Sequence, residues 1–281
     1  MTTTDVIRFG LMAGYGGVRA FHKRCFWGFN EHCPGKKEVR LFGITDLVKK
    51  HFFHKKWSPM AISGHSSRDR DIQGGSERGK KVDQQLTKWH RLKQDPKTRQ
   101  STLDKFRIKA DRYTNMVLDA LESKGWTILA TQVPVGNVDA RLGTAVDIKC
   151  RDRDGRIILI ELKCGYNGVF EMEWPASKEW AWCTGTMNHL PANARTYALI
   201  QLAWTWLLYN RSTSSGVQAN LAYVLNISDS GPTFHQLDLK LADLLLPRFR
   251  ALERQRVYRF QKLAEEKAVA KKTWKKRKTK K

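Results

Sequence analysis

The run from Ile157 to Leu162 constrains the fold more than any other segment, because it is apolar throughout except at Glu161. A strand that does not alternate between apolar and polar residues is typical of a strand buried on both faces of a sheet. Such a strand is a costly place for the charges of Glu161 and of Lys163, which follows it. Either these residues form a functional site, or they are solvated residues paired with neighbouring charges. The apolar run favours the functional site.

A second carboxylate is expected beside Glu161. Residues 142–150 (LGTAVDIKC) predict another strand, and the Asp-Gly step in the connection at 153–155 is a strong hairpin signal. In an antiparallel pair Asp147 and Glu161 lie side by side, and Lys163 shares the face of Glu161. Two facing carboxylates repel each other, and Mg²⁺ removes that repulsion because it prefers hard oxygen ligands. The spacing therefore predicts a metal site.

The rest of the chain alternates helical and strand-like segments joined by polar stretches. We expect helices within 41–57 and at 79–93, 103–124, 192–209 and 240–266, strands at 126–135, 142–150, 156–163, 217–227 and 233–239, and a loop at 58–78. This order predicts an α+β core with a central mixed sheet flanked by helices. The expected organisation is an N-terminal region with a short helix and a mobile basic loop (1–75), a main domain (76–266) and a disordered basic tail (267–281).

The charge balance predicts a polyanionic partner. The chain has 51 Lys and Arg residues against 27 Asp and Glu, and its net charge is +24. DNA or RNA is the first expected partner and an anionic membrane surface the second. No segment has the ~20 apolar residues that span a bilayer, and the N-terminus does not have the pattern of a secretory signal. The cysteines are odd in number and scattered, which predicts a reducing compartment and no secretion.

Several basic and aromatic residues are candidates for contacts with nucleic acid. Arg78, Lys80 and Lys81 belong to a basic stretch that can contact phosphates. Tyr166 and Lys178 follow the predicted site closely in sequence, and a contact with the scissile phosphate or an ordinary surface loop explains them equally well. The basic tail fits a nuclear address, a non-specific DNA clamp, or both.

The order Asp147, then Glu161-Leu162-Lys163, after a helix and a strand, resembles the PD-(D/E)XK nuclease superfamily. The neighbouring features are similar to its RecB-like and lambda-exonuclease-like branch. That branch has a Gly-x-x-Asp element, then a strand ending in (Asp/Glu)-x-Lys, and then a helix that carries a Gln followed by an aromatic residue. The resemblance extends from about residue 45 to residue 227.

The chain departs from the branch pattern at several positions. Gly143 precedes the Asp by four residues rather than three, and Gln201 has Thr205 where the branch has a Tyr. Gln132 stands where a Glu is common, which puts a second metal site in doubt. Asp83 stands where an upstream helix of the branch supplies a metal-binding His.

The resemblance implies a restriction-endonuclease-like core that hydrolyses phosphodiester bonds with Mg²⁺ or Mn²⁺. The implied metal ligands are Asp147, Glu161, the backbone carbonyl of Leu162 and, on the upstream helix, Asp83. Lys163 would position the attacking water and stabilise charge, because an ammonium beside carboxylates is a poor base at neutral pH. Gln201 would orient the water, Lys163 or the substrate phosphate.

These expectations together predict an exonuclease or end-processing enzyme that acts on DNA. A structure-selective endonuclease is the first alternative. A non-catalytic nucleic-acid-binding protein that kept the nuclease fold is the second. A homo-oligomer and a recombination or replication partner protein are compatible with these functions. The basic tail adds the expectation of a nuclear location, which includes the host nucleus of a virus or mobile element.

Overall fold

The fold is described from a computed structural model of the chain. The described residues are 26–28, 39–57, 68–137, 139–166, 169–173, 175–212 and 217–278. Most of the predicted N-terminal region, residues 1–75, therefore lies outside the described residues. Among the described residues, no helix is both long enough and apolar enough to cross a membrane.

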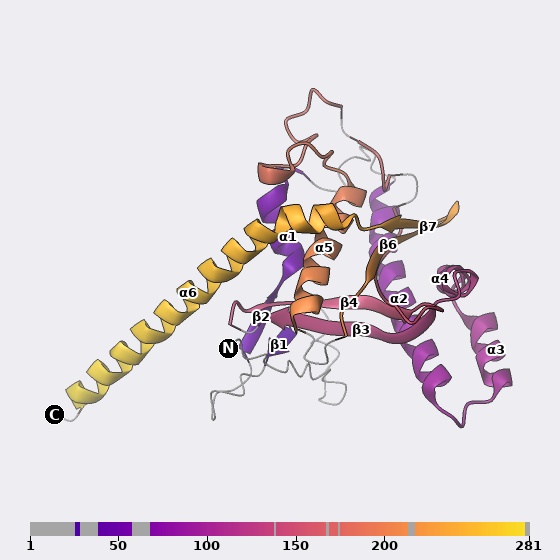
Figure 1. The fold of residues 1–281 in the computed structure, drawn as a ribbon, viewed down its shortest axis with the longest axis horizontal. Coiled ribbons are helices and arrows are strands. Elements are labelled where there is room, and N and C mark those ends of the chain that lie inside the picture. The colour runs from indigo at the N-terminus through magenta and orange to yellow at the C-terminus, as the bar shows by residue number, and fades with distance from the viewer. Residues whose placement is uncertain are drawn as a thin grey trace.

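A central mixed sheet organises the molecule (Figure 1). Its strands in the described residues are β1 (Phe26–Gly28), β2 (Val39–Gly43), β3 (Thr127–Asn137), β4 (Leu142–Arg151), β5 (Ile157–Cys164), β6 (Leu221–Ser228) and β7 (Gly231–Gln236). They are ordered β1-β2-β4-β5-β6-β7, and β3 pairs with β4 beside this path. The β2–β4 and β5–β6 pairs are parallel and the others are antiparallel. The predicted α+β fold with a central mixed sheet is confirmed.

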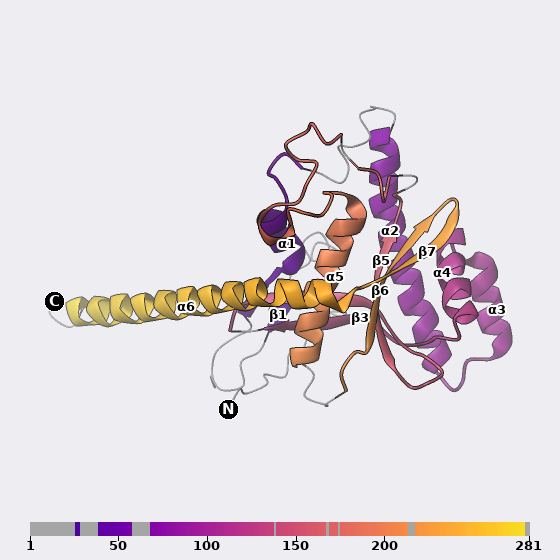
Figure 2. The same ribbon diagram turned by 45° about the horizontal axis from the view of Figure 1, so that its top comes forward.

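Helices cover both faces of the sheet (Figure 2). They are α1 (Ile44–Phe52), α2 (Arg68–Gln94), α3 (Gln100–Lys109), α4 (Arg112–Ser123), α5 (Ala194–Ser212) and α6 (Leu239–Lys278). One core cluster joins α1, α5 and the first part of α6 to the sheet, and a second joins α2 and α4 to the other face. In β5, Ile157 and Leu159 belong to the first cluster, whereas Ile158 and Ile160 belong to the second. This alternation explains the apolar run, as predicted.

The edge of β4 opens beside Asp147. The strand β3 pairs with β4 from one end to the other along one edge. The opposite edge is shared, because β5 pairs with β4 from Ile148 to Arg151 and β2 pairs with it at Leu142 and Gly143. The edge between these two pairings has no strand partner among the described strands. The Asp-Gly turn that joins β4 to β5 is confirmed, and Gly155 takes the positive φ of 82° that favours glycine.

The segment 103–124, predicted as one helix, forms two helices instead. The Asp111 side chain accepts a hydrogen bond from the Tyr113 backbone N–H at 3.0 Å and caps the start of α4. Asp is among the strongest N-capping residues, so a new helix begins at this point although the apolar spacing continues through it. The helix prediction failed here because periodicity does not report a cap inside a regular pattern.

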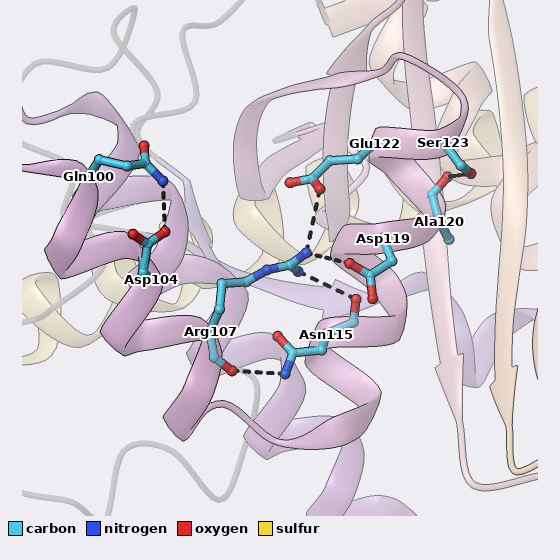
Figure 3. Close-up of polar contacts among 8 residues, drawn as sticks. All are labelled: Gln100, Asp104, Arg107, Asn115, Asp119, Ala120, Glu122 and Ser123. Atoms are coloured by element: carbon cyan, nitrogen blue, oxygen red, sulfur yellow. Dashed lines mark hydrogen bonds and ion pairs between the residues drawn. The ribbon is translucent and has the colours of Figure 1, made fainter.

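Arg107 joins α3 to α4 (Figure 3). Its guanidinium contacts the carboxylates of Asp119 and Glu122 and the backbone carbonyl of Asn115. The Asn115 amide donates in return to the Arg107 carbonyl at 2.9 Å. These contacts fix the two short helices side by side on the α2 face of the molecule.

Two helices are longer than predicted. The helix α2 begins at Arg68, so residues 68–78 are helical rather than part of a loop. Once the turns around Val82 have formed, extending the helix towards its start needs no new nucleus, although each glycine in the segment costs about 1 kcal/mol. The helix α6 runs to Lys278, so the tail predicted as disordered is helical to that residue, and 279–281 lie outside the described residues. Ala, Glu, Lys and Arg are strong helix formers, which accounts for the extension.

Candidate active site

Asp147 lies at the opened edge of β4, where its side chain replaces a strand partner. Its Oδ2 accepts a hydrogen bond from the Leu162 backbone N–H at 2.9 Å. Its Oδ1 accepts a hydrogen bond from the Gln132 side-chain amide at 3.2 Å. The β4–β5 register, in which Ile148 faces Ile160, leaves Asp147 next to Glu161 at the end of the ladder. The structure therefore brings together the two carboxylates that the sequence predicted to meet.

Glu161, Lys163 and Gln201 form a closed polar triangle on the α5 face of the sheet. The Lys163 ammonium donates to Glu161 Oε1 at 2.7 Å and to Gln201 Oε1 at 3.3 Å. The Gln201 amide donates to the same Glu161 oxygen at 2.7 Å. Glu161 and Gln201 are each only 4% exposed. The predicted placement of Gln201 beside the carboxylate and the lysine is therefore present in the structure.

The Lys163 ammonium stays charged in this setting. Burial by itself lowers its pKa, but the neighbouring charges of Glu161, Tyr166 and Asp147 outweigh burial and raise the pKa above its usual value. A lysine whose pKa is raised holds its proton at neutral pH. It can therefore stabilise negative charge and donate hydrogen bonds, and it is a poor general base.

Asp83 approaches the same region from α2. The pKa of the Cys164 thiol is raised to about 12, first by burial and then by the charges of Asp83 and Asp147. Both carboxylates therefore lie within electrostatic reach of one thiol at the end of β5. The Asp83 side chain is half-buried, and the helix α2 packs against β3 and β5. Asp83 therefore lies within electrostatic reach of Cys164, on the face of the sheet that α2 covers.

The residues at the site fit a hard divalent cation by their chemistry. Among the described residues, no group of three or more His, Cys, Asp or Glu side chains is arranged to hold a metal. Mg²⁺ commonly binds through one or two carboxylates and keeps several waters, so Asp147, Glu161 and the Leu162 carbonyl are a sufficient donor set. All three donors are oxygens, which suits Mg²⁺ or Mn²⁺ better than a softer ion.

The predicted nucleic-acid contacts are distributed unequally around the site. The Arg78 guanidinium lies 4.5 Å from the centroid of the Tyr113 ring, and its charge also reaches Cys164. Lys80 is exposed, whereas the Lys81 ammonium pairs with Asp111 at 2.9 Å. Lys81 is therefore already engaged in holding α2 against the start of α4.

Of the two other predicted nucleic-acid contacts, Tyr166 lies near the candidate site, and Lys178 contacts a ring outside it. Tyr166 lies close enough to Lys163 to contribute to its raised pKa. The Lys178 ammonium lies 5.9 Å from the centroid of the Trp180 ring and contacts no site residue in the described part of the chain. The geometry favours Tyr166 over Lys178 as a neighbour of the candidate site.

Gln132 is a site residue whose role the sequence did not reveal. It lies opposite Asp147, between the cross-strand pairs Thr131–Ile148 and Val133–Val146. Its φ of 51° is in the left-handed region, which costs a residue other than glycine about 1–3 kcal/mol. The family resemblance had marked Gln132 only as a position where a Glu is common, and the sequence gives no hint of the backbone strain.

On α5 the chain has Thr205 where the resembled branch has a Tyr, and the structure shows the contacts of Thr205 and of the nearby Tyr197. Thr205 is fully buried, and its hydroxyl donates to the Gln201 carbonyl at 2.9 Å within the helix. Tyr197 lies one turn before Gln201, and its hydroxyl donates to the Thr45 carbonyl at 3.2 Å. Thr205 therefore contributes to helix packing, and Tyr197 is an aromatic residue of this helix that lies within electrostatic reach of Lys163 and Glu161.

Comparisons with known proteins leave the family of the chain open. No protein-family model and no curated protein matches it. A solved structure described as "Crystal structure of SSO0001" is similar over 76% of this chain and 77% of its own, with 14% sequence identity and a TM-score of 0.28. A likeness with so low a TM-score carries no argument about fold or function.

Proposed function

We propose that this protein is a Mg²⁺- or Mn²⁺-dependent nuclease that hydrolyses phosphodiester bonds of DNA, as an exonuclease or end-processing enzyme. The observation that carries the proposal is the arrangement of Asp147, Glu161 and Lys163 at the end of a buried strand, with Gln201 completing the hydrogen bonds. The resemblance of the Asp147…Glu161-Leu162-Lys163 pattern to PD-(D/E)XK nucleases supports it.

Burial of these charges supports a functional role. Glu161 is 4% exposed and the Lys163 side chain 16% exposed. A buried ion pair is seldom more stable than apolar residues of similar volume, because removing both charges from water costs several kcal/mol. A site that binds a cation and a phosphate gives such charges a use.

Each side chain has a role that its contacts allow. Asp147, Glu161 and the Leu162 carbonyl would hold the divalent cation, whose chemistry at this site would be Lewis-acid charge neutralisation and a lowered pKa of water. The Lys163 ammonium, which keeps its proton, would stabilise the negative charge that develops on the phosphate and orient the water. Gln201 holds Lys163 and Glu161 in place and is a positioning residue.

DNA as the substrate follows from charge. The net charge of +24 supplies a non-specific attraction for a polyanion. On α2, the charge of Arg78 reaches Cys164 and Lys80 is exposed, so both can contact a phosphate backbone. The thiols of Cys150, Cys164 and Cys183 are free, which fits the proposed reducing compartment, and the basic end of α6 fits the proposed nuclear location.

The test is degradation of end-labelled linear DNA and of a closed circle of the same sequence, with Mg²⁺, Mn²⁺ or EDTA. Asp147→Asn and Lys163→Met remove the two charges, and Asp154→Asn and Lys149→Met serve as matched controls on the same hairpin. We expect metal-dependent loss of the linear DNA with wild type and both controls, and none with the site variants. Survival of the circle supports an exonuclease, and its cleavage supports an endonuclease. Equal activity in the site variants would overturn the proposal.

A further inference from the structure

An open cavity lies away from the candidate active site, where α6 leaves the body of the molecule. Its volume is about 380 Å³. Its lining includes Asn137 at the end of β3, Arg211 near the end of α5, and Arg250, Glu253, Arg254 and Tyr258 on α6. None of these residues belongs to the Asp147–Glu161–Lys163 site.

The buried acidic residue of this cavity, Glu253, already has its charge neutralised. Glu253 is only 4% exposed, and its Oε1 accepts a hydrogen bond from the Asn137 amide at 2.8 Å. Its other oxygen is paired with the Arg211 guanidinium. Glu253 thus anchors α6 to the ends of α5 and β3. Its carboxylate is committed to this network, so it is a weak competitor for further cations at the mouth of the cavity.

Two arginines at the mouth remain unengaged. Arg250 and Arg254 are exposed, and neither has an ion-pair or hydrogen-bond partner in the described part of the chain. They are four residues apart on α6 and so lie on one face of the helix. Planar guanidinium groups in such a pair match the geometry of a phosphate group, which accepts two hydrogen bonds from each.

An aromatic ring continues this row. Tyr258 follows Arg254 by one further turn of α6, lines the same cavity and is 68% exposed. Proteins that bind single-stranded nucleic acid combine exposed aromatic rings with basic side chains. The bases stack on the rings while the phosphates bind the basic groups. A metabolite phosphate alone would have no use for the ring.

We propose that this cavity binds an unpaired segment of a nucleic-acid strand, with phosphates at Arg250 and Arg254 and a base stacked on Tyr258. The inference deepens the proposed nuclease function and rests on it for the identity of the strand. The cavity would hold single-stranded DNA at a point away from the bond that is cut. Beyond the cavity, α6 continues to Lys278 as a basic helix that projects from the body (Figures 1 and 2).

The test is the affinity of the full chain for a fluorescent single-stranded oligodeoxynucleotide in EDTA, where no cleavage occurs. The pocket variants are Arg250→Ala with Arg254→Ala, and Tyr258→Ala. The matched control is Arg259→Ala with Lys262→Ala, which removes two charges from the same helix outside the cavity lining. Thermal unfolding of each variant checks that the fold is retained, which the exposure of these side chains predicts.

We expect the arginine pair variant to lower affinity about tenfold and the control at most about threefold. The slope of log affinity against log salt concentration should fall by about 1.4 in the arginine variant, for two lost phosphate contacts to a single strand. Tyr258→Ala should lower affinity about fivefold or more with the slope unchanged.

Three results would overturn the proposal. They are equal losses in the pocket and control variants, no binding of the oligonucleotide by wild type, and complete displacement of the oligonucleotide by millimolar thymidine monophosphate. The last result would show that a free nucleotide is the ligand. Tight binding in EDTA without any cleavage in Mg²⁺ would contradict the proposed nuclease and leave the cavity assignment standing, so the two failures are distinguishable.

Discussion

The side-chain amide of Gln132 donates to the Asp147 carboxylate at 3.2 Å across the β3–β4 pair, from a backbone whose φ is 51°. The amide fixes one carboxylate oxygen while the Leu162 N–H fixes the other at 2.9 Å. Asp147 therefore has a defined orientation before any ligand arrives. A strained backbone at this position, beside the proposed site, is maintained by the surrounding structure.

Substitution of Gln132 separates positioning from backbone strain. Gln132→Ala and Gln132→Gly both remove the amide, so each should lower kcat of DNA cleavage about tenfold and weaken Mg²⁺ activation, with a smaller change in KM. The free energy of unfolding of Gln132→Gly should exceed that of Gln132→Ala by about 1 kcal/mol, because glycine accepts a positive φ. Gln132→Gly should therefore also unfold at a higher temperature. Unchanged kcat in both variants would remove Gln132 from the site.

The Glu161–Lys163 pair makes a prediction about stability and activity together. Glu161→Gln leaves the buried Lys163 ammonium without its partner charge, so the free energy of unfolding should fall by about 3 kcal/mol and cleavage should be lost. The double variant Glu161→Gln with Lys163→Met removes both charges and should recover most of that stability, while cleavage stays absent. Urea denaturation checks the stability. A double variant no more stable than the single one would contradict the pairing.

Metal binding should be visible without any substrate. Mg²⁺ that binds the folded chain raises its thermal midpoint in proportion to the logarithm of its concentration above the Kd. We expect this rise in wild type and in Asp154→Asn, and a much smaller rise in Asp147→Asn, when each protein is titrated from EDTA into millimolar Mg²⁺. Identical rises in all three proteins would show that the cation binds elsewhere.

Arg107 provides a contrasting case in which stability changes and activity does not. Its partners Asp119 and Glu122 are exposed carboxylates, and such ion pairs contribute about 1 kcal/mol or less. Arg107→Ala should therefore lower the free energy of unfolding by about 1 kcal/mol and leave the cleavage rate unchanged. A large loss of cleavage would mean that the α3–α4 unit acts on the substrate.

The local sequence signals predicted the centre of the molecule well. The apolar run through β5 and the Asp-Gly turn reported burial and pairing directly, and the register then placed Asp147 beside Glu161. These features depend on residues that are near each other in sequence, so pattern and turn chemistry are enough to predict them.

Features that depend on distant partners were not predictable. The hydrogen bond from Gln132 and its positive φ arise from the packing of β3 on β4, which no local pattern encodes. The arginine cavity needs the ends of β3 and α5 to meet α6, far apart in sequence. The helix boundary at Asp111 and the helical basic tail were mispredicted for a different reason. The spacing of apolar residues reports neither an N-cap inside a regular pattern nor a helix that is exposed to solvent on all sides.

The most direct measurement of the central claim is the single-turnover cleavage rate of a linear DNA duplex at saturating enzyme, in Mg²⁺ and in EDTA. Wild type, Asp147→Asn and the matched surface variant Asp154→Asn are compared, with DNA binding of all three measured in EDTA. We expect cleavage in Mg²⁺ by wild type and Asp154→Asn at similar rates, a loss of at least 100-fold (~2.7 kcal/mol) in Asp147→Asn, and equal DNA binding by all three proteins. Cleavage by Asp147→Asn at the wild-type rate, or no cleavage by wild type that binds DNA, would contradict the central claim.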